Sequence, residues 1–272
     1  LVAVLKGGNC SERDVSLESG GAVARALRNA GYRVNEIDIQ EPAVTDEMRQ
    51  ADIIFPVFHG GFGENGEIQT LMEQHKLNFV GCGSTASKLI IDKIASKKIM
   101  RQHGIPTADW AVVTPENRKF PENLTLPVVV KPPCEGSTFG IVLVESMTDW
   151  NNALDRAFKY DGSALLVEKF IAGKETTVGI INGEPLPMVE IQIPGKIYDF
   201  DAKYTHALGE TRYLCPPETI PEEQQKKAAE IALAFYHASG ARDILRVDII
   251  IGEDGNMYVL EGNSLPGFTA SS

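Results

Sequence analysis

The first third of the chain alternates short apolar runs with amphipathic segments. Apolar runs predict strands at residues 1–8, 34–39, 51–60 and 77–81, and helical periodicity predicts helices at 15–31 and 67–76. Strands that alternate with helices indicate a parallel sheet with helices on both faces. Ligands of such sheets bind beyond the carboxyl ends of the strands. Polar residues stand at two of these ends, Ser11, Glu12 and Arg13 after the first strand and His59 and Glu64 after the third.

The pattern changes after residue 84. A helix is expected over residues 84–104, and it is followed by strands at 109–114, 127–133, 141–146 and 164–170, with a helix at 147–159. Two more strands, 175–183 and 184–191, precede a long polar loop, a helix at 221–240 and closing strands at 244–252 and 256–263. This order predicts an α/β and α+β protein in three parts.

Composition narrows the function classes. The chain of 272 residues is 43% hydrophobic and 23% charged, as in ordinary globular proteins, and its net charge of -11 disfavours binding to a nucleic-acid backbone. The four cysteines match no zinc pattern and no dense disulfide framework, which favours reduced thiols. No apolar run has transmembrane length and no signal region opens the chain. Because Leu1 is not a methionine, we expect a few residues to precede it.

The two closing strands are joined by "EDGN", a strong hairpin signal. A two-residue turn at Asp254 and Gly255 would pair Ile249 with Leu260. Counting further outward, it would place four polar residues on one face at the open end, with Tyr258 and Leu260 on the core face. The four polar residues are Arg246, Asp248, Glu261 and Asn263.

The opposed carboxylates of Asp248 and Glu261 would repel each other unless a cation lay between them. Two carboxylates and an amide suit Mg²⁺ or Mn²⁺ rather than zinc. The alternatives are that one carboxylate points to solvent, or that a longer loop shifts the register by one residue. The neighbouring Arg246 and Asn263 favour the metal.

A glycine-rich loop connects two of the central strands. Gly136 and Gly140 bracket hydroxyl residues, and backbone N–H groups of such a loop can close over phosphates. It is not a Walker loop, and many similar loops are only hairpin connections. Lys131, at the end of the preceding strand, and Lys93 could reach a phosphate, although for either lysine taken alone the pattern favours a solvated surface position.

Taken together, these segments resemble the D-alanine–D-alanine ligases, ATP-grasp enzymes of bacterial peptidoglycan synthesis. The resemblance runs in order through "GGNCSERDVSLESG", "FHGGFGENGEIQTLME", "VGCGSTASKLIIDKIASKKIMRQHGIP", "LPVVVKPPCEGSTFGIVLV", "VEKFIAGKETTVGIINGEPLP", "YDFDAKYT", "RYLCPPE", "RVDIII" and "LEGNSLPGFT". It implies that ATP phosphorylates the carboxylate of a first D-alanine, and that the amine of a second D-alanine displaces phosphate from the acylphosphate.

The resemblance also implies site residues. Two Mg²⁺ or Mn²⁺ ions would be held by Asp248, Glu261 and Asn263, and ATP would be contacted by Lys93, Lys131, Glu168, Lys169, Phe170, Ile171, Glu175 and Lys203. The catalytic residues would be Glu12 at the ammonium of the first D-alanine, Ser137 and Tyr204 hydrogen-bonded beside it, and Arg246 with the backbone N–H of Gly267 at the oxyanion. His59 and Ser272 would bind substrate.

The implied organisation is a cytoplasmic homodimer with three parts in each chain. These are a substrate-binding α/β domain at 1–84, a central ATP-grasp subdomain with the glycine loop at 85–167, and a C-terminal subdomain with the metal site at 168–272. The chain stops before the proline-containing segment and final helix that follow in the family, so we expect it to be incomplete at its C-terminus.

The second substrate is less constrained by the pattern. The family's D-alanine–D-lactate ligases tend to have phenylalanine where this chain has Tyr204, which favours an amine as second substrate. A D-alanine–D-serine or D-alanine–D-lactate ligase, and a nucleotide-binding relative without turnover, are the alternatives. Gly262, "STFG" and "GENG" depart from the usual family residues, but none of these departures removes a ligand.

Overall fold

The computed structural model describes residues 1–136, 140–193 and 211–269.

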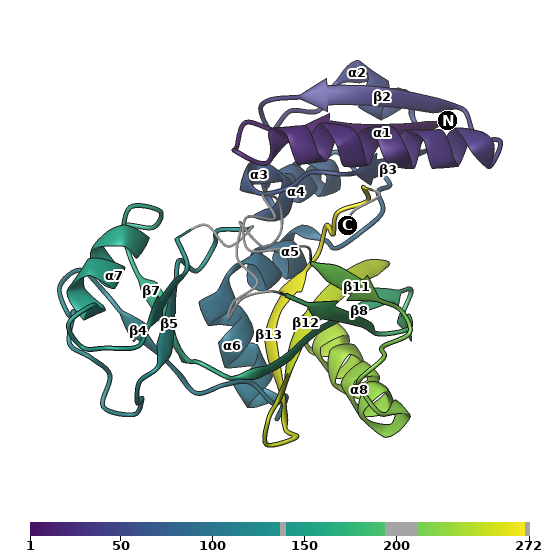
Figure 1. Cartoon of the computed structure of the whole chain (residues 1–272). Coiled ribbons are helices and arrows are strands. Elements are labelled where there is room, and N and C mark those ends of the chain that lie inside the picture. Colours follow the sequence, from purple (N-terminus) through teal and green to yellow (C-terminus); the bar gives the residue numbers. More distant parts are fainter. Residues whose placement is uncertain (137–139, 194–210, 270–272) are drawn as a thin grey trace.

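The N-terminal unit contains a small parallel sheet. Strands β1 (Val2–Gly7), β2 (Val34–Ile39) and β3 (Ile53–Pro56) pair in parallel in the order β2-β1-β3. The predicted fourth strand at 77–81 is reduced to one bridge between Ile54 and Phe79. Helices α1 (Arg13–Asn29) and α4 (Glu67–Gln74) flank this sheet at one end of the molecule, shown at the top of Figure 1.

Helix α1 packs closely on β1 because its buried face is built from small residues. Ser16, Ser19, Gly20 and Ala24 are all buried. A Cβ atom at Gly20 would lie only 2.7 Å from the Cβ of Lys6, so glycine allows the helix to approach the strand. The short helices α2 (Asp46–Gln50) and α3 (Gly61–Glu64) were not predicted.

The single helix predicted over residues 84–104 is wrong: the structure has two helices, α5 (Ser84–Ile91) and α6 (Lys93–Gln102). Asp92 between them has extended backbone angles. Its Oδ1 accepts hydrogen bonds from the N–H groups of Ile94 and Ala95, at 2.9 and 3.0 Å, so it caps the second helix. The break puts Lys93 on the first turn of α6.

A four-stranded antiparallel sheet forms the central unit. Its order is β4 (Trp110–Val113), β7 (Leu165–Lys169), β5 (Val128–Lys131) and β6 (Val142–Val144), and α7 (Trp150–Ala157) packs against it. The core between helix and sheet includes Trp150, Leu154 and Val130.

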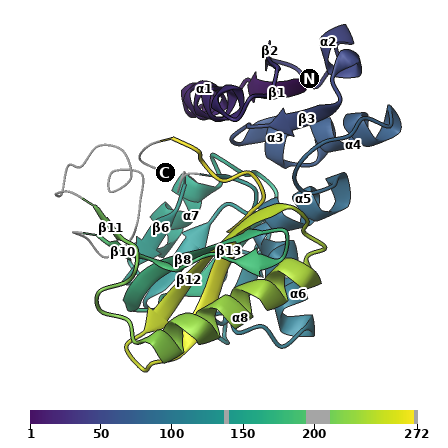
Figure 2. The ribbon, with the colours of Figure 1, turned by 90° about the vertical axis from the view of Figure 1, so that its right-hand side faces the viewer.

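The largest sheet is antiparallel and lies beside the central unit. Its order is β11 (Arg212–Leu214), β10 (Val189–Gln192), β8 (Gly173–Ile181), β12 (Ile244–Gly252) and β13 (Met257–Asn263), and β9 (Glu184–Pro185) pairs with β8. Helix α8 (Glu222–Ala238) crosses one face of this sheet (Figures 1 and 2). The strand predicted at 184–191 is interrupted at Pro187, which lacks an N–H for pairing. Strand β11 was not predicted.

The predicted register of the β12–β13 hairpin is right at its open end and wrong at its turn. Gly252 and Asn256 close a three-residue loop in which Gly255 has φ of +78°, and Ile249 pairs with Val259 rather than Leu260. A bulge next to Ile249 then restores the predicted pairs, Arg246 with Asn263 and Asp248 with Glu261. The loop shifts the register by one residue, and the bulge shifts it back.

This cancellation changes which residues of β13 reach the core. Met257 and Val259 are buried against α8, whereas the predicted core residues Tyr258 and Leu260 are only partly buried. Leu260 instead lines the opposite face with Glu261. The bulge is therefore what allows an apolar core face and a charged face to coexist on one hairpin.

The described residues form three separate sheets, and the expected division into three parts with boundaries at residues 84 and 167 stays a prediction. The expected boundary at residue 167 would fall inside β7, which runs from Leu165 to Lys169. Ile90 and Met100, from α5 and α6, belong to the core of the largest sheet rather than to that of the central unit.

Candidate active site

A cleft of about 750 Å³ lies where the three units meet. Every predicted site residue within the described part of the chain lines it, namely Glu12, His59, Lys93, Lys131, Glu168, Lys169, Phe170, Ile171, Glu175, Arg246, Asp248, Glu261, Asn263 and Gly267. Ser137, Lys203, Tyr204 and Ser272 lie outside the described residues. Residues far apart in sequence thus converge as the resemblance implied, although their roles are not tested by this convergence.

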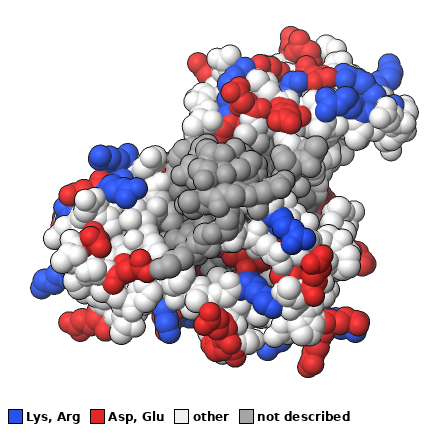
Figure 3. Space-filling view, in the orientation of Figure 1, with Lys and Arg blue, Asp and Glu red and all other residues white. Residues whose placement is uncertain are grey.

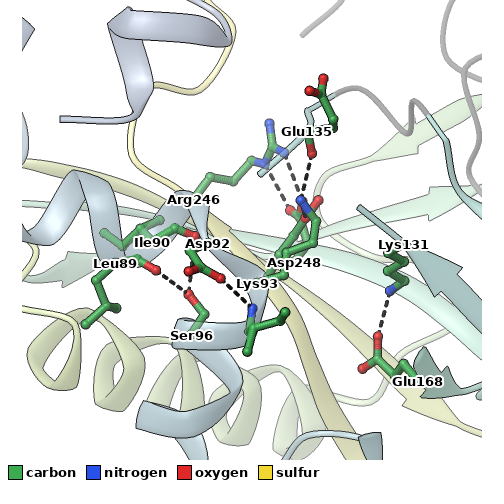
Figure 4. A network of polar contacts seen from close by, with 12 residues as sticks. Leu89, Ile90, Asp92, Lys93, Ser96, Lys131, Glu135, Glu168, Arg246 and Asp248 are labelled. Carbon is green, nitrogen blue, oxygen red and sulfur yellow. Dashed lines mark hydrogen bonds and ion pairs between the residues drawn. The ribbon is translucent and has the colours of Figure 1, made fainter. Parts of the chain in front are cut away.

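The predicted metal ligands lie at the open end of the hairpin. Arg246 Nε and Nη2 each donate to Asp248 at 2.9 Å, and Thr177 Oγ1 donates to Asp248 Oδ1 at 2.7 Å. Lys93 Nζ lies 3.1 Å from Glu261 Oε2 and donates to the carbonyl oxygen of Glu135 at 2.8 Å. The two opposed carboxylates are therefore each compensated by a cation, and several of these contacts are drawn in Figure 4.

The donor set fits a hard divalent cation. Asp248 and Glu261 offer carboxylate oxygens and Asn263 an amide oxygen, and such oxygen ligands suit Mg²⁺ or Mn²⁺. The Asn263 Oδ1 accepts the N–H of Leu265 at 3.0 Å, and a carbonyl oxygen has a second lone pair. Among the described residues no group of three His, Cys, Asp or Glu side chains could hold a metal ion.

The end of the cleft formed by β5 and β7 contains a buried carboxylate between two lysines. Glu168 is 2% exposed, and its Oε2 accepts a hydrogen bond from Lys131 Nζ at 2.7 Å (Figure 4). Its other oxygen pairs with Lys97, which is fully buried on α6. Burial raises the pKa of Glu168, but the two lysines outweigh burial, and the net shift is downward. Glu168 is therefore ionised.

Lys97 was missed by the sequence analysis. It lies four residues after Lys93, one helical turn along α6, and this spacing was the available signal. Its contact with Glu168 joins residues that are 71 positions apart, which no local pattern reveals.

At the end of the cleft formed by the N-terminal unit, Glu12 stands at the start of α1. A Cβ atom at Gly60 or Gly136 would lie 2.8 or 2.9 Å from Glu12 Oε2, so both glycines leave room for this carboxylate. Gly60 also has φ of +67°, a left-handed conformation that favours glycine. The glycines of two separate loops thus allow the chain to close around Glu12.

Glu64 is a second carboxylate at this end, and the sequence analysis placed it at the strand end but gave it no role. It is 5% exposed, and its Oε2 accepts the N–H of Gly60 at 2.6 Å. Burial raises its pKa to about 7, and the charge of Glu12 adds to the rise, while Gly60, Arg246 and Lys93 oppose it.

His59 belongs to a network that fastens the chain's last described segment to the N-terminal unit. Burial, assisted by Arg246, lowers the pKa of His59 to about 4, so its imidazole is neutral at pH 7. Ser19 Oγ accepts the N–H of Phe268 at 3.2 Å and lies 3.2 Å from His59 Nε2. Since the serine hydroxyl has one proton, it can accept from Phe268 and donate to the neutral imidazole.

Apolar contacts reinforce this attachment. Leu265 is buried in the core of the N-terminal unit, and the Phe268 ring meets that of Phe55 edge to face at 6.0 Å between centroids. Figure 1 shows the yellow segment after β13 running up to the N-terminal unit. Gly267 is thereby held between two anchored residues. The sequence analysis missed Ser19, as it missed Lys97, because its partner Phe268 lies 249 positions away in the sequence.

The outer surface carries charges of both signs. On the face shown in Figure 3, acidic and basic side chains are interspersed among uncharged residues. No helix in the described ranges has the length and apolar character needed to cross a membrane.

Comparisons with known proteins identify the family. The family model for the D-ala D-ala ligase C-terminus matches residues 99–272, and that for the N-terminus matches residues 38–82. The D-alanine–D-alanine ligase of Carboxydothermus hydrogenoformans is 42% identical, with 100% of this chain and 90% of that protein covered. That of Syntrophotalea carbinolica is 39% identical, with 100% and 88% covered.

Solved structures agree. The D-alanine–D-alanine ligase of Bacillus anthracis complexed with ATP has a TM-score of 0.86 at 29% identity and covers 100% of this chain and 88% of that one. The VanG D-Ala:D-Ser ligase of Enterococcus faecalis has a TM-score of 0.87 at 27% identity, with 100% and 92% covered. The expected fold class is confirmed as ATP-grasp, and the chain belongs to the D-alanine–D-alanine ligase family.

Proposed function

We propose that this protein is an ATP-dependent ligase that joins two molecules of D-alanine into D-alanyl-D-alanine, a precursor of peptidoglycan. Its family and its ATP-grasp fold support this assignment. The observation that carries it furthest is the convergence of lysines, an arginine and oxygen ligands in one cleft between three units. These are the groups that phosphoryl transfer to a carboxylate requires.

The nucleotide would occupy the side of the cleft formed by β5, β7 and β8. Lys131 and Lys93 would exchange their carboxylate partners for phosphates of ATP, and residues 169–171 with Glu168 and Glu175 would contact adenine and ribose. Lys203 would add a further cation. Bound by Asp248, Glu261 and Asn263, two Mg²⁺ or Mn²⁺ ions would neutralise charge on the transferring phosphoryl group.

The amino acids would occupy the opposite side. The Glu12 carboxylate would hold the ammonium of the first D-alanine, with Ser137 and Tyr204 beside it, and His59 and Ser272 would complete the substrate contacts. The first carboxylate would attack the γ-phosphorus of ATP, and ADP would leave. The second amine, having lost a proton to solvent, would then attack the acylphosphate carbon, and phosphate would leave. Arg246 and the N–H of Gly267 would stabilise the oxyanion of that step.

A D-alanine–D-serine ligase is the second candidate, because the VanG D-Ala:D-Ser ligase matches the fold as closely as the D-alanine–D-alanine ligase does. We favour D-alanine as second substrate because the most similar sequences reported above are D-alanine–D-alanine ligases. From the family resemblance alone we also propose a homodimer in the cytoplasm, which sedimentation of the purified protein and fractionation of cells would test.

An isotope experiment tests the acylphosphate route. With D-alanine labelled with ¹⁸O in its carboxylate, ATP and Mg²⁺, we expect D-alanyl-D-alanine together with phosphate that contains one ¹⁸O atom. Dipeptide accompanied by unlabelled phosphate would contradict the proposed order of bond formation. Labelled phosphate with a mixed dipeptide, when D-serine is also present at equal concentration, would favour the second candidate.

A further inference from the structure

The Glu168 carboxylate has two cationic partners that differ in their surroundings. Lys131 is 13% exposed in its side chain and lines the cleft. Lys97 has no exposed side-chain surface and is absent from the cleft lining. One lysine of the pair can therefore reach a ligand, and the other cannot.

Further hydrogen bonds fix Lys97 in place. Its Nζ donates to Thr107 Oγ1, and to the backbone oxygen of Val259 at 3.3 Å. Thr107 Oγ1 in turn donates to the same Val259 oxygen at 2.7 Å. The ammonium thus links α6, β7, β13 and the segment before β4, and it has three acceptors for its three N–H donors.

The charges explain why two lysines are present. In the structure the buried carboxylate of Glu168 contacts two lysines, and the charges of Glu261 and Glu175 act on these lysines from further away. If Lys131 turns to a phosphate, Glu168 still has a buried cation beside it. Without Lys97, the same movement would leave a buried carboxylate uncompensated, which is strongly unfavourable.

We propose that Lys97 is a positioning residue of the nucleotide site, which holds the charge of Glu168 so that Lys131 can leave Glu168 for a phosphate of ATP. This inference rests on the proposed function and assigns a role to a residue that touches neither ATP nor substrate. It predicts that loss of Lys97 weakens binding of the phosphates more than binding of the nucleoside.

Calorimetry on Lys97→Met with two ligands tests the proposal. Adenosine carries no phosphate, so its dissociation constant should change by less than about threefold, whereas that of ATP with Mg²⁺ should rise by at least about tenfold, because Lys131 stays with Glu168. A residue that only stabilises the fold would lower the melting temperature and leave the ratio of the two constants as in the wild type. That unchanged ratio would overturn the proposal.

Further variants make the interpretation specific. Lys98→Met, which removes an exposed lysine next to Lys97 on α6, should leave both constants unchanged. In Lys97→Met combined with Glu168→Gln, the carboxylate that needs compensation is absent, so the ratio should match that of Glu168→Gln alone. A double variant with a ratio as poor as that of Lys97→Met would contradict the charge argument.

Two remaining outcomes are also distinguishable. If Lys97→Met does not fold, Lys97→Gln, which retains N–H donors for Thr107 and Val259 but no charge, carries the same test with the same expected ratio. If the wild-type protein binds neither ATP nor adenosine, the proposed function fails before the role of Lys97 is reached. Binding of ATP by the wild type with an unchanged ratio in the variants overturns the role of Lys97 alone.

Discussion

The two ends of the cleft each contain a buried glutamate, and the pKa values of these two glutamates are shifted in opposite directions. Glu168, held between Lys97 and Lys131, has its pKa lowered despite burial, whereas burial next to Glu12 raises the pKa of Glu64 to about 7. Residue type and burial are the same, so the neighbouring charges decide the result. Glu168 is paired with two lysines, whereas Glu64 lies near a second carboxylate, that of Glu12.

The largest expected effect concerns the proposed metal site, which would lie between the two ends of the cleft. Glu261→Ala should lower turnover by at least about 10³-fold, because it removes a proposed metal ligand where the phosphoryl group would be transferred. A coupled assay of phosphate release measures turnover, and circular dichroism checks the fold. Glu253→Ala, at the exposed turn of the same hairpin, is the matched control and should retain activity. Full activity of Glu261→Ala would refute the metal assignment.

A stability measurement tests the acidic end. Glu64 has its folded-state pKa raised from 4.5 to about 7, so between these values the folded state keeps a proton that the unfolded state loses. Its contribution to the free energy of unfolding therefore falls as pH rises from about 4.5 to 7, and the loss levels off above 7.

Glu64→Gln removes this titration and retains an oxygen that can accept from Gly60. The variant should gain about 3 kcal/mol relative to the wild type between pH 4.5 and 8, measured by urea unfolding at each pH. His59, with its pKa lowered to about 4, gives the opposite slope below pH 6.5, but it is present in both proteins and cancels in the difference. A difference that does not vary with pH would show that Glu64 is ionised, as Glu168 is.

Loss of the hydrogen bond that attaches Phe268 to the N-terminal unit should have a smaller effect on turnover. Ser19→Ala removes the acceptor of the Phe268 N–H next to Gly267, so kcat should fall about tenfold with little change in KM for ATP. Steady-state kinetics with each substrate varied gives this separation. A proportional change in KM for ATP would place the effect at the nucleotide end and contradict a local role. Ser239→Ala, buried at the end of α8, controls for loss of a buried hydroxyl.

The smallest expected effect concerns the second substrate. Tyr204→Phe should raise use of D-lactate relative to D-alanine by several-fold, as the family resemblance implies. Competition between the two acceptors, with products separated by mass spectrometry, measures the ratio. An unchanged ratio would count against Tyr204 as a selector.

The hairpin shows how far sequence reasoning could go in this chain. The alternation of Arg246, Asp248, Glu261 and Asn263 predicted their shared face correctly, but only because a longer loop and a bulge cancel. Neither is encoded in local hydrophobic periodicity, which is why Leu260 was wrongly placed in the core. Asp92 similarly divides a helix that periodicity alone presents as continuous.

The candidate site divides in the same way. Residues that follow strands or occupy glycine-rich motifs, such as Glu12 and Lys131, could be proposed from sequence. Lys97 and Ser19 could not, because their importance depends on partners that the fold brings from distant segments. The raised pKa of Glu64 likewise depends on burial and on the charge of Glu12, which only the assembled cleft provides.

The most direct test of the whole account is a screen of phosphate release from ATP and Mg²⁺ over D-amino and D-hydroxy acids. We predict that phosphate is released when D-alanine is the acid added, with one phosphate formed for each D-alanyl-D-alanine. Release that proceeds equally without an amino acid, or that requires a different acid and ignores D-alanine, would contradict the account.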